Sequence, residues 1–238
     1  NPSVEAVYIA LTNNLHHEWI NRSAIYKKHI MVEKPACTNI NELKKSLTII
    51  KENKVFFMEA MMYRHHPQIK ILIDLLNSNK IGKVKKIEAY FGFDIGRKIF
   101  GLELKKLDKN SRLLNPNLGG GAILDLGCYP LSASLLVAGI TEKKTLLIPD
   151  NIKATGNIGT TGVDEIAYAE ISFPNGIIAQ IGVAIRKKMK NFLKVIGEKG
   201  YVNVPNPWTP NSKFSLEMKE NDQFKIINHF SDRPLYTH

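Results

Sequence analysis

The sequence predicts an α/β protein in which a partial doubly wound parallel sheet is followed by an α+β region with a large, mostly antiparallel sheet. Up to about residue 60, short apolar runs alternate with helical stretches, as successive right-handed βαβ units require. After about residue 145, the chain becomes rich in strand patterns separated by turn residues. Because the pattern changes after Ala60, we expect two domains, 1–62 and 63–238.

The first domain is predicted to hold strands and helices in alternation. Its strands, each a short apolar run, are expected at 4–11, 29–32 and 55–58. The first run is nearly continuous, which indicates a strand covered on both faces. The helix after it should run over about 15–28, with an apolar face of Leu15, Trp19, Ile20 and Ile25. Asn39 should cap the next helix, because Glu42 follows at capping-box spacing, and that helix should end near Asn53.

The second domain should begin with a helix over about 67–79 and a strand over 84–93. Irregular chain is expected over 94–118. The helix predicted at 122–137 consists mostly of small and apolar residues, so it should be largely buried. Hairpins follow, with turns expected at 174–176, 198–200 and 219–223. These hairpins are what predicts the antiparallel sheet.

The 238 residues carry a formal net charge of +11, a value that can indicate a nucleic-acid partner. The lysines are scattered in pairs, without an arginine-rich block or an aromatic RNA-recognition motif, so we expect no nucleic acid. No apolar run approaches the ~20 residues of a membrane span, and no charged-then-apolar leader opens the chain. We therefore expect a soluble cytoplasmic protein without a membrane partner. Cys37 and Cys128 are too few and too far apart for a disulfide framework or a zinc site.

Lys34 lies in the run Val32-Glu33-Lys34-Pro35, directly after an apolar strand pattern. A lysine in such a place is most often a solvated surface residue. In a doubly wound sheet, however, ligands bind outside the carboxyl ends of the strands, and Pro35 makes the following turn stiff. Lys34 is therefore a candidate site residue, with a surface lysine as the alternative.

Asp125 and Tyr129 lie four residues apart in the predicted helix after Gly119-Gly120-Gly121, so their side chains should share one face. Gly127 between them would cost roughly 1 kcal/mol in an ordinary exposed helix, which suggests a close approach of backbone or ligand. Together with a lysine, such a pair could hold a hydroxyl or carbonyl and move a proton beside a hydride carrier. A helix-terminal carboxylate and a packed tyrosine would explain the pair equally well.

Other polar residues leave alternatives open. Arg64 could bind a substrate oxygen or anion, or it could pair with an acidic residue. The adjacent histidines at 16–17 and at 65–66 point to different sides of any helix or strand, so no metal is predicted. Cys128 is interpreted as a small buried residue, and Trp208 either as a cap over a substrate pocket or as a shielding aromatic.

Several motifs occur in a fixed order along the whole chain. They are Thr12-Asn13-x-x-His16, Glu33-Lys34-Pro35, Glu59-Ala60-Met61-Met62-Tyr63-Arg64 and Gly119-Gly120-Gly121-x-x-x-Asp125-x-Gly127-x-Tyr129-Pro130. Together they resemble the Gfo/Idh/MocA family of NAD(P)-dependent oxidoreductases. Tyr129, where many members carry histidine, is similar to the branch of dihydrodiol dehydrogenases, D-xylose dehydrogenases and glucose-fructose oxidoreductase.

The resemblance implies hydride transfer between NAD or NADP and a sugar, cyclitol or related hydroxyl or carbonyl compound. The residues that would contact the cofactor are Thr12, Asn13, His16, Glu33, Lys34 and Pro35. Asp125, Tyr129 and Arg64 would bind the substrate. Tyr129 would be the catalytic acid or base and Lys34 its electrostatic partner, because a neighbouring ammonium favours the phenolate. Catalysis would therefore depend on Lys34, Asp125 and Tyr129.

The phosphate-binding Gly-x-Gly-x-x-Gly turn of a Rossmann-type domain does not occur in this sequence. Position 4 already reads as a later strand, so we expect 1–62 to be the C-terminal part of a Rossmann-type dinucleotide-binding domain. Two alternatives remain open: a reductase of a different carbonyl or imine substrate, and a non-catalytic family member that serves as a binding or assembly module. The resemblance further implies that 63–238 binds substrate and forms a homodimer or larger homo-oligomer.

Overall fold

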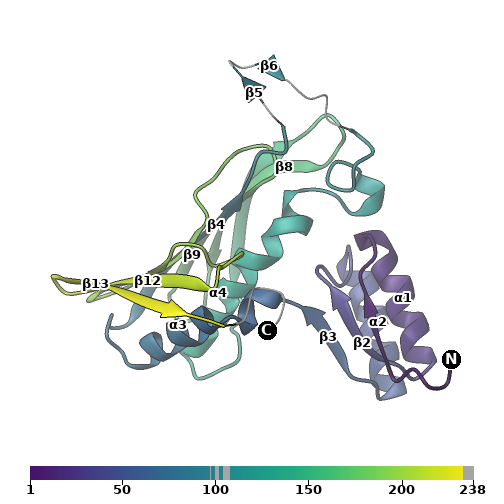
Figure 1. Cartoon of the computed structure of the whole chain (residues 1–238), viewed down its shortest axis with the longest axis horizontal. Helices are drawn as coiled ribbons and strands as arrows, with labels where there is room; N and C mark the ends of the chain where they lie inside the picture. Colours follow the sequence, from purple (N-terminus) through teal and green to yellow (C-terminus); the bar gives the residue numbers. More distant parts are fainter. Residues whose placement is uncertain (97, 100–101, 104–107, 233–238) are drawn as a thin grey trace.

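The computed structural model describes residues 1–96, 98–99, 102–103 and 108–232. The chain forms two lobes, each built on its own sheet (Figure 1). The small lobe has a three-stranded sheet in the order β1-β2-β3, and the large lobe an eight-stranded sheet in the order β13-β12-β11-β10-β4-β9-β8-β7. Within the large sheet, β4 and β9 are parallel and the other neighbours are antiparallel. The predicted fold class is therefore confirmed.

The small lobe alternates strands with helices. Its elements are β1 (Ala6–Ile9), α1 (Asn13–Ile25), β2 (His29–Glu33), α2 (Ile40–Asn53) and β3 (Phe57–Ala60). All strand pairs are parallel, so the carboxyl ends of the strands meet at one edge of the sheet. Asn39 caps α2 as predicted, accepting hydrogen bonds from the backbone N–H groups of Asn41 and Glu42. The Glu42 carboxylate accepts in turn from the backbone and hydroxyl of Thr38.

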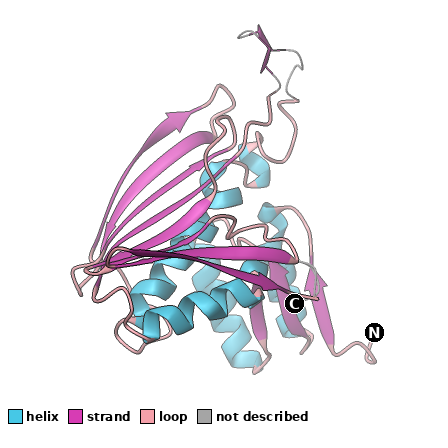
Figure 2. Ribbon diagram, turned by 60° about the vertical axis from the view of Figure 1, so that its left-hand side comes forward, coloured by secondary structure: helices cyan, strands magenta, loops and turns pink. Residues whose placement is uncertain are grey.

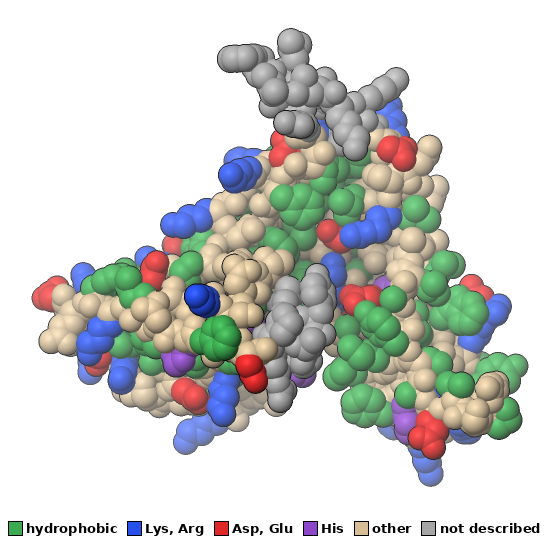
Figure 3. Space-filling view, viewed as in Figure 1, with side chains coloured by type: hydrophobic (Ala, Val, Ile, Leu, Met, Phe, Trp, Pro, Cys, Tyr) green, Lys and Arg blue, Asp and Glu red, His purple; other side chains and the backbone are tan. Residues whose placement is uncertain are grey.

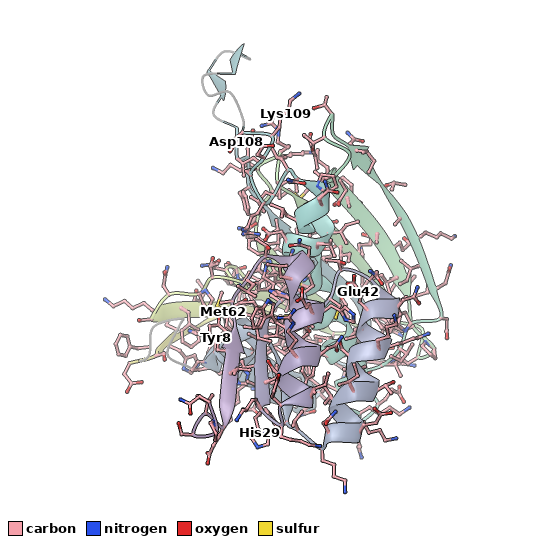
Figure 4. The ribbon with its side chains drawn as sticks, turned by 90° about the vertical axis from the view of Figure 1, so that its right-hand side faces the viewer. Tyr8, His29, Glu42, Met62, Asp108 and Lys109 are labelled. Atoms are coloured by element: carbon pink, nitrogen blue, oxygen red, sulfur yellow. The ribbon has the colours of Figure 1, made fainter. Side chains whose placement is uncertain are left out.

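Two expectations for this lobe were wrong. Both helices pack on one face of the sheet, around Ile9, Ile30 and Val32, and no described element covers the opposite face. Tyr8, on that face, is 58% exposed and lies on the side of β1 away from α1 and α2 (Figure 4). In α1, polar residues with internal hydrogen bonds occupy much of the core-facing stripe, so Trp19, which was predicted to be buried, is exposed. Ile25 is also exposed. Exposed apolar side chains of this lobe are visible in green in Figure 3.

The large lobe starts at η1 (Met62–His65) and adds helices to one long sheet. Its other helical elements are α3 (Pro67–Asn77), η2 (Pro116–Leu118), η3 (Ile123–Gly127) and α4 (Cys128–Ile140). The strands of the eight-stranded sheet are β4 (Val84–Gly92), β7 (Asn151–Ile158), β8 (Asp164–Ser172), β9 (Ile178–Ala184), β10 (Phe192–Gly197), β11 (Gly200–Val204), β12 (Lys213–Glu220) and β13 (Gln223–Phe230). The short strands β5 (Lys98–Ile99) and β6 (Leu102–Glu103) pair with each other in a separate two-stranded sheet. The three predicted hairpins are confirmed as β8–β9, β10–β11 and β12–β13.

The helices of the large lobe cover one face of the eight-stranded sheet (Figure 2). The predicted helix at 122–137 is in fact a π-helical turn, η3, that continues directly into α4. Among the described residues, the stretch Pro116–Ile140, which holds η2, η3 and α4, is long and apolar enough by length and composition alone to cross a membrane, with a mean hydropathy of 1.6 over its most apolar part. Of its most apolar part, 56% is buried inside the protein. Packing against the sheet therefore accounts for much of its apolar character.

Candidate active site

The three consecutive glycines mark the place where the two lobes meet. A Cβ at Gly119 would lie 2.7 Å from the Cβ of Asn13 on α1. At Gly120 it would lie 2.7 Å from carbonyl oxygens of the preceding loop. At Gly121, whose φ is +113°, it would overlap the Asp164 carboxylate on β8. Each glycine is thus required by a different neighbour, and the segment leads directly into η3.

Lys34 reaches across this junction from the end of β2. Its Nζ donates to the main-chain oxygen of Asp125 at 2.5 Å and lies 3.4 Å from Asp125 Oδ1. The side chains of Lys34 and Asp125 are only 15% and 7% exposed. The same Nζ lies 5.2 Å from the centroid of the Tyr129 ring. The structure therefore brings together the three residues proposed from sequence, and the solvated-lysine alternative was wrong.

Tyr129 is buried in a group of four aromatic rings, which we call the aromatic cluster. Its centroid lies 5.7 Å from that of Tyr63, 5.3 Å from that of Phe91 and 6.1 Å from that of Trp208. Trp208 is fully buried, and its Nε1–H donates to the Tyr90 carbonyl at 2.8 Å. The indole is therefore fixed in the core and shields one side of Tyr129 from water.

Arg64 and its neighbour Tyr63, both on η1, are tied to Ser132 of α4. Arg64 Nε donates to Ser132 Oγ and Arg64 Nη2 to Ser132 O, both at 2.9 Å. The Tyr63 hydroxyl donates to Ser132 Oγ at 3.1 Å, and burial raises the pKa of Tyr63, which keeps this hydroxyl protonated. Within the described residues, the hydrogen bonds of Arg64 go to Ser132 and not to a carboxylate. Its contact with a substrate stays a prediction.

Two charged residues that were not predicted from the sequence, Arg112 and Asp164, bind to η3. Arg112 Nη1 lies 2.8 Å from Asp125 Oδ1, so the carboxylate sits between two cations, Lys34 and Arg112. The Arg112 side chain is 55% exposed. Asp164 Oδ2 accepts the backbone N–H of Ile123 at 2.7 Å, although burial raises the pKa of Asp164. No motif of the sequence connects Arg112 or Asp164 with Asp125, and the fold alone brings these residues to η3.

Among the residues predicted to contact a cofactor, those on and before α1 bond to the protein in this structure. Thr12 Oγ1 donates to Asn14 Oδ1 at 2.7 Å, and Asn13 Nδ2 donates to Gly119 O at 2.8 Å. His16 is fully buried, with Nδ1 2.8 Å from Pro35 O and Nε2 3.1 Å from a second carbonyl oxygen. Their contact with a nucleotide stays a prediction.

Glu33 and Pro35 flank Lys34 at the same strand end. The Glu33 carboxylate accepts from the Tyr8 hydroxyl, and this hydrogen bond raises the pKa of Tyr8 to about 12. The Lys34–Pro35 peptide bond is cis. On the far side of Pro35, the backbone N–H of Ala36 donates to Glu59 Oε1 at 2.8 Å. Tyr8 and the role of Glu59 were not foreseen from the sequence.

An apolar pocket of about 320 Å³ lies beside η3 and the start of α4, against β7, β8 and β9. Gly127, Cys128 and Pro35 contribute to its wall. A Cβ at Gly127 would meet only the side chain of Ile123, at 3.5 Å, so the predicted close approach of backbone was wrong. A close approach of ligand stays a prediction. Burial raises the pKa of the Cys128 thiol to about 12, so it remains protonated at neutral pH. No cluster of three or more metal-ligating side chains occurs among the described residues.

Comparison with known proteins agrees with this architecture. Residues 1–61 match the family model described as "Oxidoreductase family, NAD-binding Rossmann fold", and residues 69–203 match the "GFO/IDH/MocA C-terminal domain". An uncharacterized oxidoreductase, ORF334 of Rhizobium meliloti, is 30% identical over 210 residues, which cover 88% of this chain and 58% of that protein. The trans-1,2-dihydrobenzene-1,2-diol dehydrogenase of Mus musculus is 28% identical over the same shares. The chain thus spans 58% of the length of these relatives.

Two solved structures show the same fold. KijD10, a 3-ketoreductase from Actinomadura kijaniata in complex with NADP and TDP-benzene, superposes with a TM-score of 0.78 at 25% identity, covering 97% of this chain and 66% of that one. The aldose-aldose oxidoreductase from Caulobacter crescentus gives a TM-score of 0.80 at 24% identity, covering 98% and 65%. Together with the matched family models, this similarity shows that the chain belongs to the GFO/IDH/MocA family of oxidoreductases.

Proposed function

We propose that the protein containing this chain is an NAD(P)-dependent oxidoreductase that acts on a hydroxyl or carbonyl group of a sugar, cyclitol or related compound. The observation that carries the proposal is the convergence of Lys34, Asp125 and Tyr129 at the junction of the lobes. Membership of the family supports the reaction class. The names of the mouse diol dehydrogenase and the Actinomadura 3-ketoreductase support the substrate class.

The chemistry of the carboxyl edge of β1-β2-β3 fits the nicotinamide half of NAD(P). Ligands of doubly wound sheets bind at this edge, where half-buried Glu33, Lys34 and Pro35 offer a carboxylate, an ammonium and an apolar ring. The 238 residues contain no Gly-x-Gly-x-x-Gly turn, so residues that would grip the pyrophosphate are not found in them. When bound, NAD(P) supplies the carbon that gives or accepts the hydride.

The chain's own residues would handle the proton and the charge. The Tyr129 hydroxyl would donate a proton to a carbonyl oxygen during reduction, or accept one from a hydroxyl during oxidation. The Lys34 ammonium would stabilise the negative charge that develops on the reacting oxygen and on the phenol. Asp125 holds this ammonium through its main-chain oxygen and its carboxylate. The aromatic cluster would exclude water from one side of the Tyr129 ring.

The test begins with the native protein that contains this chain. Titration with NADH and NADPH, followed by cofactor fluorescence, should show saturable binding of at least one of them. The absence of binding to either would refute the proposal and favour the alternative of a non-catalytic binding or assembly module. A subsequent substrate screen over sugars, cyclitols, diols and other carbonyl compounds would identify the substrate class.

Matched variants then test the roles of the side chains. Tyr129→Phe keeps the ring in the aromatic cluster but removes the hydroxyl, so turnover should fall about 10²–10⁴-fold with little change in stability. Lys34→Ala should also reduce turnover. The same two substitutions at a lysine–tyrosine pair outside the site, Lys194→Ala and Tyr201→Phe, serve as controls and should leave turnover near the wild-type value. Lys194 and Tyr201 lie on the large sheet, where the ammonium is 4.0 Å from the ring centroid. Turnover that persists in Tyr129→Phe would remove Tyr129 from the mechanism.

We also propose that the protein forms a homodimer or larger homo-oligomer through the sheet face that α3 and α4 leave uncovered. Tyr90 and Phe192 stack on that face with centroids 5.3 Å apart, and the rings of Tyr90 and Tyr168 approach Gly182. An aromatic face of this kind favours burial in an interface. Light scattering should show an oligomer, and Tyr168→Lys should weaken it. A wild-type monomer would contradict this assignment.

A further inference from the structure

The peptide unit between Pro35 and Ala36 is held by side chains at both of its polar groups. Its carbonyl oxygen lies 2.8 Å from His16 Nδ1, and its N–H donates to Glu59 Oε1 at 2.8 Å. His16 comes from α1 and Glu59 from β3, so two different elements grip one peptide. This peptide lies one residue beyond Lys34, whose side chain reaches the other lobe.

The same face of α1 also holds the other lobe. Asn13 and His16 lie one helical turn apart, so their side chains project from the same side of α1. Asn13 Nδ2 donates to Gly119 O at 2.8 Å in a buried bond, and Gly119 leaves no room for a Cβ beside Asn13. Gly119 opens the segment that carries Asp125 and Tyr129. One turn of α1 therefore contacts both Pro35, the residue after Lys34, and Gly119, at the start of the segment that carries Asp125 and Tyr129.

Both ring nitrogens of His16 lie within hydrogen-bonding distance of protein carbonyl oxygens. His16 is fully buried, and its second nitrogen, Nε2, lies 3.1 Å from Leu11 O, at the end of the chain segment that leads into α1. A neutral imidazole donates one hydrogen bond, to Pro35 O or to Leu11 O according to its tautomer, and rotation of the ring would leave that carbonyl without its donor. His16 therefore lies between Leu11, which follows β1, and Pro35, which follows Lys34. The arrangement is a rigid frame and not an open ligand-binding surface.

We propose that Asn13, His16 and Glu59 are positioning residues that set the placement of Lys34 relative to Asp125 and Tyr129. Lysine has a flexible stem of four carbons, so its ammonium is placed accurately only if its backbone is fixed. Asn13 holds Gly119, the first of the three glycines, while His16 and Glu59 hold the Pro35–Ala36 peptide, one residue beyond the lysine. This inference rests on the proposed oxidoreductase function, and it assigns the Thr12-Asn13-x-x-His16 motif an internal structural task at the site.

The first experiment tests the hydrogen bond between the Ala36 N–H and Glu59 without a measurement of activity. Amide hydrogen exchange of Ala36 in the native protein should accelerate about fivefold or more in Glu59→Leu, which removes the acceptor of its hydrogen bond. Glu59→Gln retains a carbonyl oxygen at the same place, so its Ala36 exchange should stay near the wild-type rate. Equal exchange of Ala36 in the wild type and in Glu59→Leu would overturn the assignment of Glu59.

The second experiment separates positioning from contact with the cofactor. Asn13→Ala and His16→Leu should lower kcat about 10–100-fold while the dissociation constant of NAD(P)H stays near the wild-type value. His16→Asn, which offers an amide donor near the position of Nδ1, should recover part of kcat. His17→Asn is the control, because His17 is the adjacent residue on α1 but binds Ser46 of α2, at 2.9 Å.

The outcomes are distinct. A fall in kcat with unchanged cofactor affinity supports positioning, whereas weaker cofactor binding with unchanged kcat would mean direct contact and overturn it. Unchanged kcat in both Asn13→Ala and His16→Leu would overturn it as well. If His16→Leu fails to fold, Asn13→Ala and Glu59→Leu decide the matter. If the wild-type protein shows no turnover, the proposed function fails, while the exchange of the Ala36 amide still tests whether Glu59 holds the Pro35–Ala36 peptide.

Discussion

Gly121 precedes the π-helical turn η3 and Gly127 is its last residue, and adding one methyl group at each should have opposite effects on stability. Gly121 has a φ of +113°, and a Cβ there would overlap the Asp164 carboxylate. Gly127 has φ −62° and ψ −28°, ordinary helical values, and its Cβ would meet only Ile123 at the normal contact distance of 3.5 Å. Alanine is therefore strained at the first position and comfortable at the second.

The magnitudes follow from these contacts. In Gly121→Ala the backbone strain costs about 1–3 kcal/mol. Displacing Asp164 also breaks its 2.7 Å bond to the Ile123 N–H, a helix-capping bond worth about 0.5–2 kcal/mol. We expect a total loss of about 2–4 kcal/mol in the free energy of unfolding. Gly127→Ala should instead stabilise the chain by about 0.5–1 kcal/mol, because alanine restricts the unfolded chain and favours helix.

Equilibrium urea unfolding, monitored by circular dichroism and by tryptophan fluorescence, measures both effects. The unfolding midpoint should fall for Gly121→Ala and rise slightly for Gly127→Ala, with the slope unchanged for both. Midpoints that shift equally in the two variants would refute the reasoning, because they would show that the Asp164 contact and the positive φ are not what requires glycine at 121. A hydrogen-exchange measurement of the Ile123 amide would locate the loss in Gly121→Ala.

Three further predictions concern the stability of the chain. Asn39→Ala removes the two backbone hydrogen bonds that cap α2, so the free energy of unfolding should fall by about 1 kcal/mol, as urea unfolding would show; no change would mean that water replaces the cap. Trp208→Ala empties a fully buried site and removes the hydrogen bond from the indole to the Tyr90 carbonyl, so it should cost about 3–5 kcal/mol; a midpoint near wild type would contradict the buried position. The pKa of Cys128 is raised from 9.0 to about 12, so burial of its protonated thiol contributes stability below about pH 9 that is lost as the pH rises toward 12. Iodoacetamide should therefore label Cys128 slowly in the folded protein at pH 8 and rapidly in urea, and equal rates would exclude the buried thiol.

Most of the architecture was predictable from sequence because its causes are local. The cap at Asn39 and the hairpin around Pro174-Asn175-Gly176 depend on residues close together in the chain, and both occur where expected. The helical face of α1 was mispredicted for a physical reason. His16 and other polar residues take core-facing positions through internal hydrogen bonds, so a search for apolar periodicity selects Trp19 instead.

The candidate site was only partly predictable. Motif order brought Lys34 and the Asp125/Tyr129 pair to attention, but no local pattern reveals that Arg112 shares the Asp125 carboxylate. The same holds for Glu59, whose partner is the backbone N–H of Ala36. Such contacts depend on how two lobes approach each other, and many different residues could satisfy them. They leave little trace in the spacing of a single sequence.

The sequence by itself determined the types and order of the elements, since periodicity, caps and turn residues act over short distances. It also determined the inventory of reactive groups: a lysine at a strand end, and a carboxylate and a phenol one helical turn apart. The tertiary structure alone decided that these groups meet. Lys34 and Asp125 are 91 positions apart in the chain, and their contact requires Asn13 and the three glycines to bring the lobes within hydrogen-bonding distance. The reason is physical: a hydrogen bond forms only within a few tenths of an ångström of its proper length, and packing, not spacing along the chain, sets that distance.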